Sequence, residues 1–158
     1  MKKIIVLYFS GTGNTKRMAE YVSEGAKDVP GTDVDVRSVE DFRVEELEAF
    51  DGMIIGSPTY YGTMAYQIKK LLDDSVVLHG RLVGRAGAAF SSSANIGGGN
   101  ETTILSILSA MLIHGMVVQG MEKGGHYGTV AIGRPDKRAE EQCRELGRRV
   151  AELVQKVR

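Results

Sequence analysis

The chain has 158 residues, of which 42% are hydrophobic and 25% are charged, values that are typical of a soluble globular domain. Lysine and arginine together number 20, and so do aspartate and glutamate, so the formal net charge is zero. A neutral chain lacks the positive field that attracts nucleic acids and anionic membranes. No apolar run approaches the ~20 residues of a membrane span. We therefore expect one domain over residues 1–158, with no nucleic-acid or membrane partner.

Cysteine content and the N-terminal residues bear on where the protein works. The single cysteine, Cys143, cannot form an intrachain disulfide, which fits a reducing cytoplasm. The apolar run after Lys3 is shorter than the core of a usual signal peptide, and glycines follow it rather than a cleavage site. We therefore expect a cytoplasmic protein. Cys143 lies on the apolar stripe of the final predicted helix and is given no redox role.

Strands and helices alternate along the chain. The first apolar run, residues 4–9, ends in a glycine loop, as strands covered by helices on both faces do. Apolar residues at helical spacing then run to Lys27, and Pro30 and Gly31 end that helix. Further strands are predicted at 33–38, 53–57, 87–91 and, as two pieces of one strand or as two strands, at 117–119 and 129–132; further helices are predicted at 44–50, 64–72, 104–112 and 136–157. This alternation predicts a doubly wound α/β sheet with helices on both faces.

The segment after the first strand is suited to binding a monophosphate. It reads Ser10-Gly11-Thr12-Gly13-Asn14-Thr15 and runs directly into a helix. Its hydroxyls, its amide and its backbone N–H groups converge where the helix end carries partial positive charge. A plain capped turn is the alternative interpretation.

Two other nucleotide-binding motifs fit this segment poorly. The P-loop pattern is absent, and Lys16 stands where a dinucleotide fingerprint needs its third glycine. Arg37 stands near the end of the second strand, where an acidic residue would hold the ribose of NAD. The pattern therefore favours a mononucleotide.

Two more segments follow neighbouring strands. Pro58-Thr59-Tyr60-Tyr61-Gly62 places exposed aromatic rings where they can stack on a planar group, although they could instead cover the sheet edge. The other segment is Ser92-Ser93-Ala94-Asn95-Ile96-Gly97, whose backbone groups could form hydrogen bonds with the polar edge of a ring. A flexible surface loop is the alternative interpretation. One ligand with a phosphate, an aromatic plane and a hydrogen-bonding edge would contact all three segments, and FMN is such a ligand. No catalytic side chain and no metal site is predicted.

Two further motifs are Gly-Gly-Gly-Asn-Glu-Thr at 97–102 and His-Gly-Met-Val-Val at 114–118. With these motifs, and with the segments at 56–62 and 124–128, the chain resembles the WrbA family of flavodoxin-like NAD(P)H:quinone oxidoreductases. The resemblance implies a five-stranded parallel sheet of order 2-1-3-4-5, and FMN held by Ser10 to Thr15, Pro58 to Gly62 and Ser92 to Gly97. It also implies NAD(P)H and a quinone or another small electron acceptor as partners, and a homo-oligomer, either a dimer or a tetramer.

The roles of His126 and Tyr127 are open, and the resemblance places both near the flavin or quinone pocket. Ile113 stands where the family has a histidine that contacts flavin. His114 ends a predicted helix, where a structural role suits it. The wide apolar face of residues 104–112 fits either an oligomer interface or a buried central helix.

The sequence favours an enzyme, and we expect the first of the following functions, with the others as alternatives. The first is an FMN-dependent NAD(P)H:quinone oxidoreductase in which the cofactor performs the two-electron chemistry. The second is a flavodoxin-type carrier of single electrons between proteins. Zero net charge disfavours the carrier, because such carriers tend to be acidic for electrostatic docking. A flavin-binding accessory module with weak turnover is a third alternative.

Overall fold

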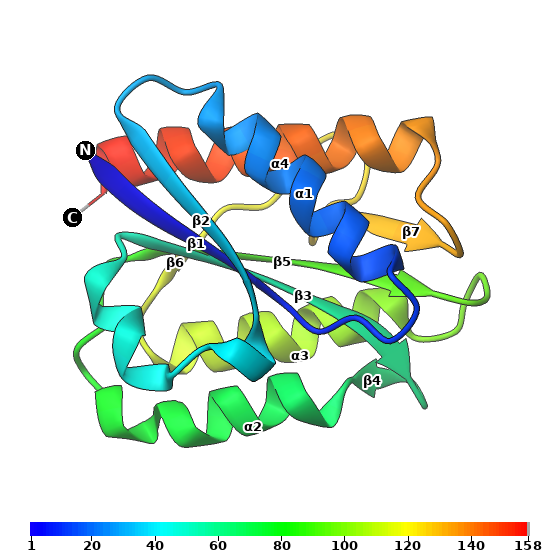
Figure 1. The fold of residues 1–158 in the computed structure, drawn as a ribbon, viewed down its shortest axis with the longest axis horizontal. Coiled ribbons are helices and arrows are strands. Elements are labelled where there is room, and N and C mark those ends of the chain that lie inside the picture. The colour runs from blue at the N-terminus through cyan, green and yellow to red at the C-terminus, as the bar shows by residue number, and fades with distance from the viewer. Residues whose placement is uncertain (158) are drawn as a thin grey trace.

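The computed structural model describes residues 1–157 and shows a parallel sheet between two layers of helices (Figure 1). The sheet order is β2-β1-β3-β5-β6, and β7 also pairs with β5. The strands are β1 (Lys2–Tyr8), β2 (Thr32–Ser38), β3 (Gly52–Tyr60), β4 (Thr63–Met64), β5 (Ala86–Ser93), β6 (Val117–Val118) and β7 (Val130–Ile132). The helices are α1 (Asn14–Lys27), α2 (Tyr66–Asp74), α3 (Asn100–Ile113) and α4 (Lys137–Lys156), with short 3-10 helices η1 (Val39–Asp41), η2 (Val44–Ala49) and η3 (Ser75–Leu78).

The last strand of the sheet consists of two pieces. β6 pairs with the beginning of β5, at Ala86 and Gly87, and β7 pairs with its end, at Ser91 to Ser93. The pairings among β1, β2, β3, β5, β6 and β7 are all parallel. Counting β6 and β7 as one strand gives the order 2-1-3-4-5, so the predicted fold class is confirmed.

Several predicted boundaries were wrong: β5 runs to Ser93 rather than to residue 91, α3 begins at Asn100 rather than at residue 104, and the third strand is longer than expected. We expected the third strand to end at Ser57, but β3 continues through Pro58 to Tyr60 and turns back as the antiparallel strand β4. Proline is tolerated there because β1 ends opposite Gly56, which leaves β3 without that neighbour at Pro58. The predicted loop is therefore a hairpin, with Tyr61 and Gly62 at its turn.

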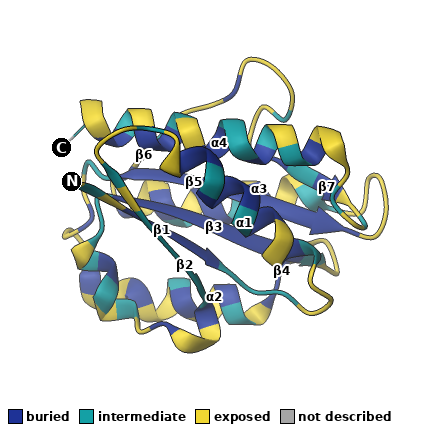
Figure 2. Ribbon diagram, turned by 45° about the horizontal axis from the view of Figure 1, so that its top comes forward, coloured by how far each residue is buried: buried dark blue, intermediate teal, exposed yellow. Residues whose placement is uncertain are grey.

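The buried strands divide the core into two layers. Successive side chains of β1 point to opposite faces, so Ile4 and Val6 pack in one apolar cluster and Ile5 and Leu7 in the other. Figure 1 shows α1 and α4 on one face of the sheet and α2 and α3 on the other. The central strands are buried along most of their length (Figure 2). Within residues 1–157, no helix combines the length and the apolar character that crossing a membrane requires.

Candidate functional site

The three segments that the sequence selects meet at one edge of the sheet. The register pairs Tyr8 of β1 with Gly56 of β3, and Pro58 of β3 with Ser92 of β5. The carboxyl ends of these three adjacent strands therefore lie side by side, and the predicted binding residues extend from them. This is the edge at which doubly wound sheets bind ligands.

The loop after β1 presents an uncapped helix end. Gly13 is the N-cap of α1, its φ is 99°, and no side chain caps the helix. The Ser10 hydroxyl accepts a hydrogen bond from the N–H of Gly13 at 3.0 Å, which holds the loop closed. The first N–H groups of any helix lack partners within the helix. The first turn of α1 carries no acidic residue, so the loop fits a phosphate group.

Thr12 and Thr15 differ in their surroundings. Thr12 is exposed at the mouth of the loop. Thr15 is 1% exposed, and its hydroxyl lies 2.8 Å from the hydroxyl of Ser92 at the end of β5. The Thr15 side chain therefore ties the loop to β5, while Thr12 remains free to contact a ligand.

The two adjacent tyrosines also differ. The ring of Tyr60 packs edge-on against Phe9, with 6.3 Å between the ring centroids. Its hydroxyl lies so close to Gly11 that a Cβ atom at position 11 would be only 2.5 Å away. Tyr61 is fully exposed and has a φ of 48°, a left-handed conformation that is uncommon for a bulky side chain. Tyr60 thus contacts the loop after β1, and Tyr61 projects from the hairpin turn into solvent.

The end of β5 is buried, and the loop that follows it is open. Ser91, Ser92 and Ser93 are all buried, whereas residues 94–98 are exposed. The Ser91 hydroxyl lies 2.9 Å from the Thr59 hydroxyl of β3. The serine cluster therefore joins neighbouring strand ends, and the exposed backbone of the loop remains available to a ligand.

Sequence reasoning missed the first turn of α3, which supports this edge. Asn100 donates a hydrogen bond to the Ser93 hydroxyl at 3.0 Å. The Thr102 hydroxyl donates to the carbonyl oxygen of Gly62 at 3.0 Å, and the Thr103 hydroxyl lies 3.2 Å from the side-chain hydroxyl of Thr59. The run of polar residues just after the triple glycine was the signal that could have revealed this role.

His126, whose role the sequence left open, has a partner within its own loop. The Nδ1–H of His126 donates a hydrogen bond to the carbonyl oxygen of Met121 at 2.8 Å, which closes the loop between β6 and β7. Tyr127 is about half exposed. Their place beside a flavin or quinone stays a prediction. Cys143 is fully buried, and burial raises the pKa of its thiol to about 12, which leaves it protonated at neutral pH.

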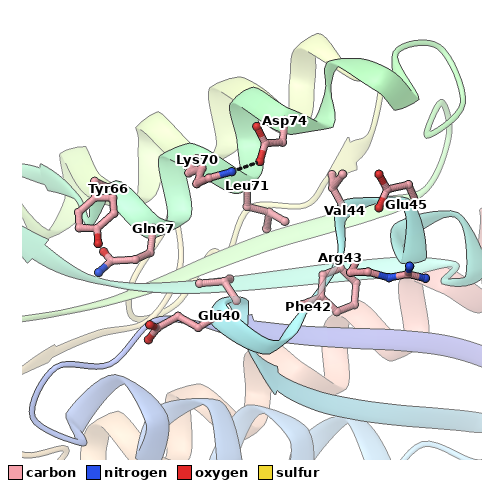
Figure 3. Close-up of a pocket in the computed structure, with 11 residues that line it drawn as sticks. Glu40, Phe42, Arg43, Val44, Glu45, Tyr66, Gln67, Lys70, Leu71 and Asp74 are labelled. Carbon is pink, nitrogen blue, oxygen red and sulfur yellow. Dashed lines mark hydrogen bonds and ion pairs between the residues drawn. The ribbon is translucent and has the colours of Figure 1, made fainter.

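A cavity of about 540 Å³ lies apart from these segments (Figure 3). It opens between η1, η2 and α2, over Phe42, Val44 and Leu71. None of its lining residues belongs to the predicted binding set. Its charged rim includes the Lys70–Asp74 ion pair of α2, so this cavity does not add to the phosphate site.

The fold is that of a doubly wound α/β protein, and the segments predicted to bind a mononucleotide lie together at the carboxyl ends of its strands. Comparison with known proteins is consistent with that class: residues 5–94 match the family model described as the flavodoxin domain. A flavodoxin of Aquifex aeolicus is 42% identical over 162 residues, which cover 98% of this chain and 88% of that protein. The chain belongs to the flavodoxin family, whose cofactor is FMN.

Two further comparisons relate the chain to quinone reductases and to WrbA-like proteins. An NAD(P)H dehydrogenase (quinone) of Archaeoglobus fulgidus is 33% identical over 191 residues, covering 99% of this chain and 100% of that protein. The solved structure of a flavodoxin, WrbA-like protein from Agrobacterium tumefaciens matches with a TM-score of 0.84 and 27% identity, over 99% of each chain.

Proposed function

We propose that this protein is a flavodoxin-type carrier that transfers single electrons between protein partners through bound FMN. The observation that carries this proposal is the uncovered hairpin turn, at which Tyr61 is fully exposed. A flavin stacked at this turn would keep an edge open to the surface of a partner. Bound FMN supplies the redox chemistry, so the chain needs only to bind, orient and partly shield it.

The proposal gives each segment a role within one FMN-binding domain over residues 1–158. Ser10 to Thr15 hold the phosphate by backbone N–H groups and by exposed side chains such as that of Thr12. Pro58 to Gly62 pack on the flavin ring, and Ser92 to Gly97 contact its polar edge. The partly buried hydrogen bonds from Asn100 and Thr103 keep these segments in position, so the site is formed before the ligand arrives.

Chain length also supports a carrier. The alignment with the Archaeoglobus quinone dehydrogenase spans 191 positions although this chain has 158 residues, so that protein has segments with no counterpart here. The alignment with the Aquifex flavodoxin spans 162 positions, which needs few such gaps. Less chain is therefore available here to build a pocket for a second substrate over the flavin.

An FMN-dependent NAD(P)H:quinone oxidoreductase is the second candidate, and the Archaeoglobus relative specifically favours it. In that case NAD(P)H would reduce the flavin by two electrons and a quinone would reoxidise it. The exposed turn would then admit small substrates rather than a partner protein.

Anaerobic reduction of the FMN-loaded protein separates the two candidates. A carrier should be reduced by dithionite in two resolved one-electron steps, and NADH and NADPH should leave the flavin absorbance almost unchanged. Rapid bleaching by either nucleotide, followed by rapid reoxidation with benzoquinone, would instead establish the oxidoreductase. Free FMN under the same conditions is the control for reduction that does not depend on the protein.

A further inference from the structure

A second cavity, of about 370 Å³, lies between α2, η3 and α3. These elements cover one face of the sheet (Figure 1). The apolar part of the cavity wall consists of Met64, Leu72, Val76, Ala110 and Ile113. None of the residues that line it belongs to the segments predicted to bind FMN. Its volume is near the lower end of the range for ligand pockets, so it suits a small molecule.

A buried histidine in the wall of this cavity has a hydrogen-bond acceptor without a donor. His114 lines the cavity and is only 7% exposed. Its Nε2 lies 2.7 Å from the Ser75 hydroxyl, which donates its own proton to the carbonyl oxygen of Leu72. Nε2 therefore carries the proton of the ring, and Nδ1 keeps its lone pair. Nδ1 is buried and has no hydrogen-bond partner within residues 1–157. Because an unpaired buried acceptor costs free energy, a ligand that donates a hydrogen bond to it is favoured.

The serine hydroxyls that line the cavity also present acceptors. Ser106 donates its proton to the carbonyl oxygen of Thr103, and Ser109 donates to that of Leu105, both at 2.8 Å. The proton of Ser75 is likewise donated to a main-chain carbonyl. These three hydroxyls therefore keep only lone pairs for a ligand. The wall favours a molecule that donates hydrogen bonds over a quinone or a carboxylate, which can only accept them.

The charges around the cavity favour a neutral ligand. Lys69 and Asp73 line it and form an ion pair of 2.6 Å, so their charges offset each other. Burial, together with the nearby His79, lowers the pKa of the His114 imidazole, which is therefore uncharged at neutral pH. Within residues 1–157, no group of three histidine, cysteine or carboxylate side chains is placed to hold a metal ion. A charged ligand would lose its water here without gaining a partner of opposite charge.

Two side chains of the wall favour an aromatic ligand. The thioether of Met64 and the imidazole of His79 both line the cavity, and groups of these kinds make favourable contacts with aromatic rings. We propose that this cavity binds a small neutral phenol, whose ring packs against the apolar wall and whose hydroxyl donates a hydrogen bond to Nδ1 of His114. The cavity is then a second ligand site, in addition to the one proposed for FMN.

The position of His114 separates this site from the cofactor edge. Helix α3 begins beside Ser93, at the carboxyl end of β5, and ends just before Val117, which pairs with Ala86 at the start of β5. The helix has 14 residues, so its two ends lie roughly 20 Å apart. His114, which directly follows α3, is therefore far from the segments predicted to bind FMN. Binding of the phenol does not depend on whether the flavin serves a carrier or an oxidoreductase.

Titration of the FMN-loaded protein with phenol, followed by amide chemical shifts and by the nitrogen-15 resonances of the histidine rings, tests this proposal. FMN is kept saturating so that phenol cannot occupy the flavin site. We expect saturable shifts at Ser75, Ala110 and His114 and none in residues 10–15. The resonance of the His114 Nδ1 should move, because it reports directly on a hydrogen bond accepted by that atom. Toluene, which lacks the hydroxyl, is the control ligand and should leave that resonance in place.

Two variants test the cavity and the hydrogen bond separately. Ala110→Leu should weaken phenol binding by at least about tenfold, because the larger side chain takes the space of the ring. Leu112→Phe is the matched control, since it enlarges a side chain of α3 that is 62% exposed and does not line the cavity. His114→Phe keeps a ring but removes the acceptor, so it should weaken phenol binding roughly tenfold and leave toluene binding unchanged.

Retained FMN binding shows that each variant is folded. The proposal is overturned if phenol gives no saturable shifts in the wild type, or if the His114 Nδ1 resonance stays in place at saturation. Phenol binding of wild-type strength in a folded Ala110→Leu variant would overturn it as well.

Discussion

Thr12 and Thr15 look equivalent in the sequence but have different surroundings. Both supply hydroxyls to the loop after β1, yet only Thr12 is exposed at its mouth, while Thr15 is buried and hydrogen-bonded to Ser92. The contribution of a side-chain hydroxyl to anion binding should therefore come from Thr12. Thr15 should contribute mainly to the stability of the edge.

Removing the Thr12 hydroxyl should weaken FMN binding. We expect Thr12→Ala to cost roughly 1.5–3 kcal/mol of binding free energy, the usual range for a hydrogen bond to a charged group. The quenching of flavin fluorescence in a titration measures this loss. Thr32→Ala, in β2, is the matched control and should bind FMN like the wild type. Equal affinity for all three proteins would contradict the phosphate assignment.

His114 is held neutral by the fold. Its Nε2 lies 2.7 Å from the Ser75 hydroxyl, which itself donates to the carbonyl oxygen of Leu72, so Nε2 carries the proton. Burial, together with the nearby His79, lowers the pKa of the His114 imidazole. The helix dipole would favour a charged histidine at this end of α3, so burial outweighs the reason that the sequence offered for this residue.

This histidine should make stability depend on pH. In the unfolded chain the imidazole binds a proton near its ordinary pKa of 6.5, whereas the folded protein takes one up only at lower pH. The free energy of unfolding should therefore fall as the pH decreases below 6.5. Urea denaturation at several pH values measures this slope, which should be smaller in His114→Asn. His79→Asn should keep most of it, and an unchanged slope in His114→Asn would count against the assignment.

At the scale of elements, two tight segments shape the cofactor edge. The hairpin turn needs a positive φ at both Tyr61 and Gly62. Gly99, the N-cap of α3, lies directly against this turn, and a Cβ atom at position 99 would come within 2.6 Å of the Gly62 Cα. The start of α3 and the hairpin therefore hold each other in place.

Two glycines of one loop should respond differently to the same substitution. Both have positive φ, 70° at Gly97 and 105° at Gly99, but a Cβ atom at position 97 would meet nothing within 4 Å. Gly97→Ala should cost about 1 kcal/mol of stability through backbone strain alone. Gly99→Ala should cost clearly more and should also reduce FMN affinity, because the hairpin must move. Thermal unfolding and flavin titration measure both effects, and equal losses in the two variants would refute the contact.

For the whole molecule, the sequence predicted the alternation of strands and helices well. An apolar run such as residues 4–9 that ends in a glycine loop is typical of a strand covered on both faces, and helical spacing placed α1 within its observed bounds. The end of β3 was not predictable in this way, because a proline usually ends a strand. Pro58 is tolerated within β3 because the neighbouring strand β1 ends opposite Gly56, before it reaches Pro58.

Contacts between segments that are far apart in the chain also could not be predicted from the sequence. The sequence could predict that the three candidate binding segments lie at one edge, because each follows a strand and parallel strands bring such segments together. The hydrogen bonds between Thr15 and Ser92 and between Thr103 and Thr59 join residues far apart in the chain. The polar run after the triple glycine could indicate a role for the start of α3, but no local pattern predicts which residues these side chains contact.

Amide chemical shifts during a titration with FMN, compared with riboflavin, test the central claim most directly. The account predicts that FMN perturbs residues 10–15, 58–62 and 92–97, while the cavity residues 39–45 stay unchanged. Riboflavin lacks the phosphate, so it should perturb only the second and third segments. If FMN instead shifted the cavity residues, or if both ligands perturbed residues 10–15 equally, the proposed site would be wrong.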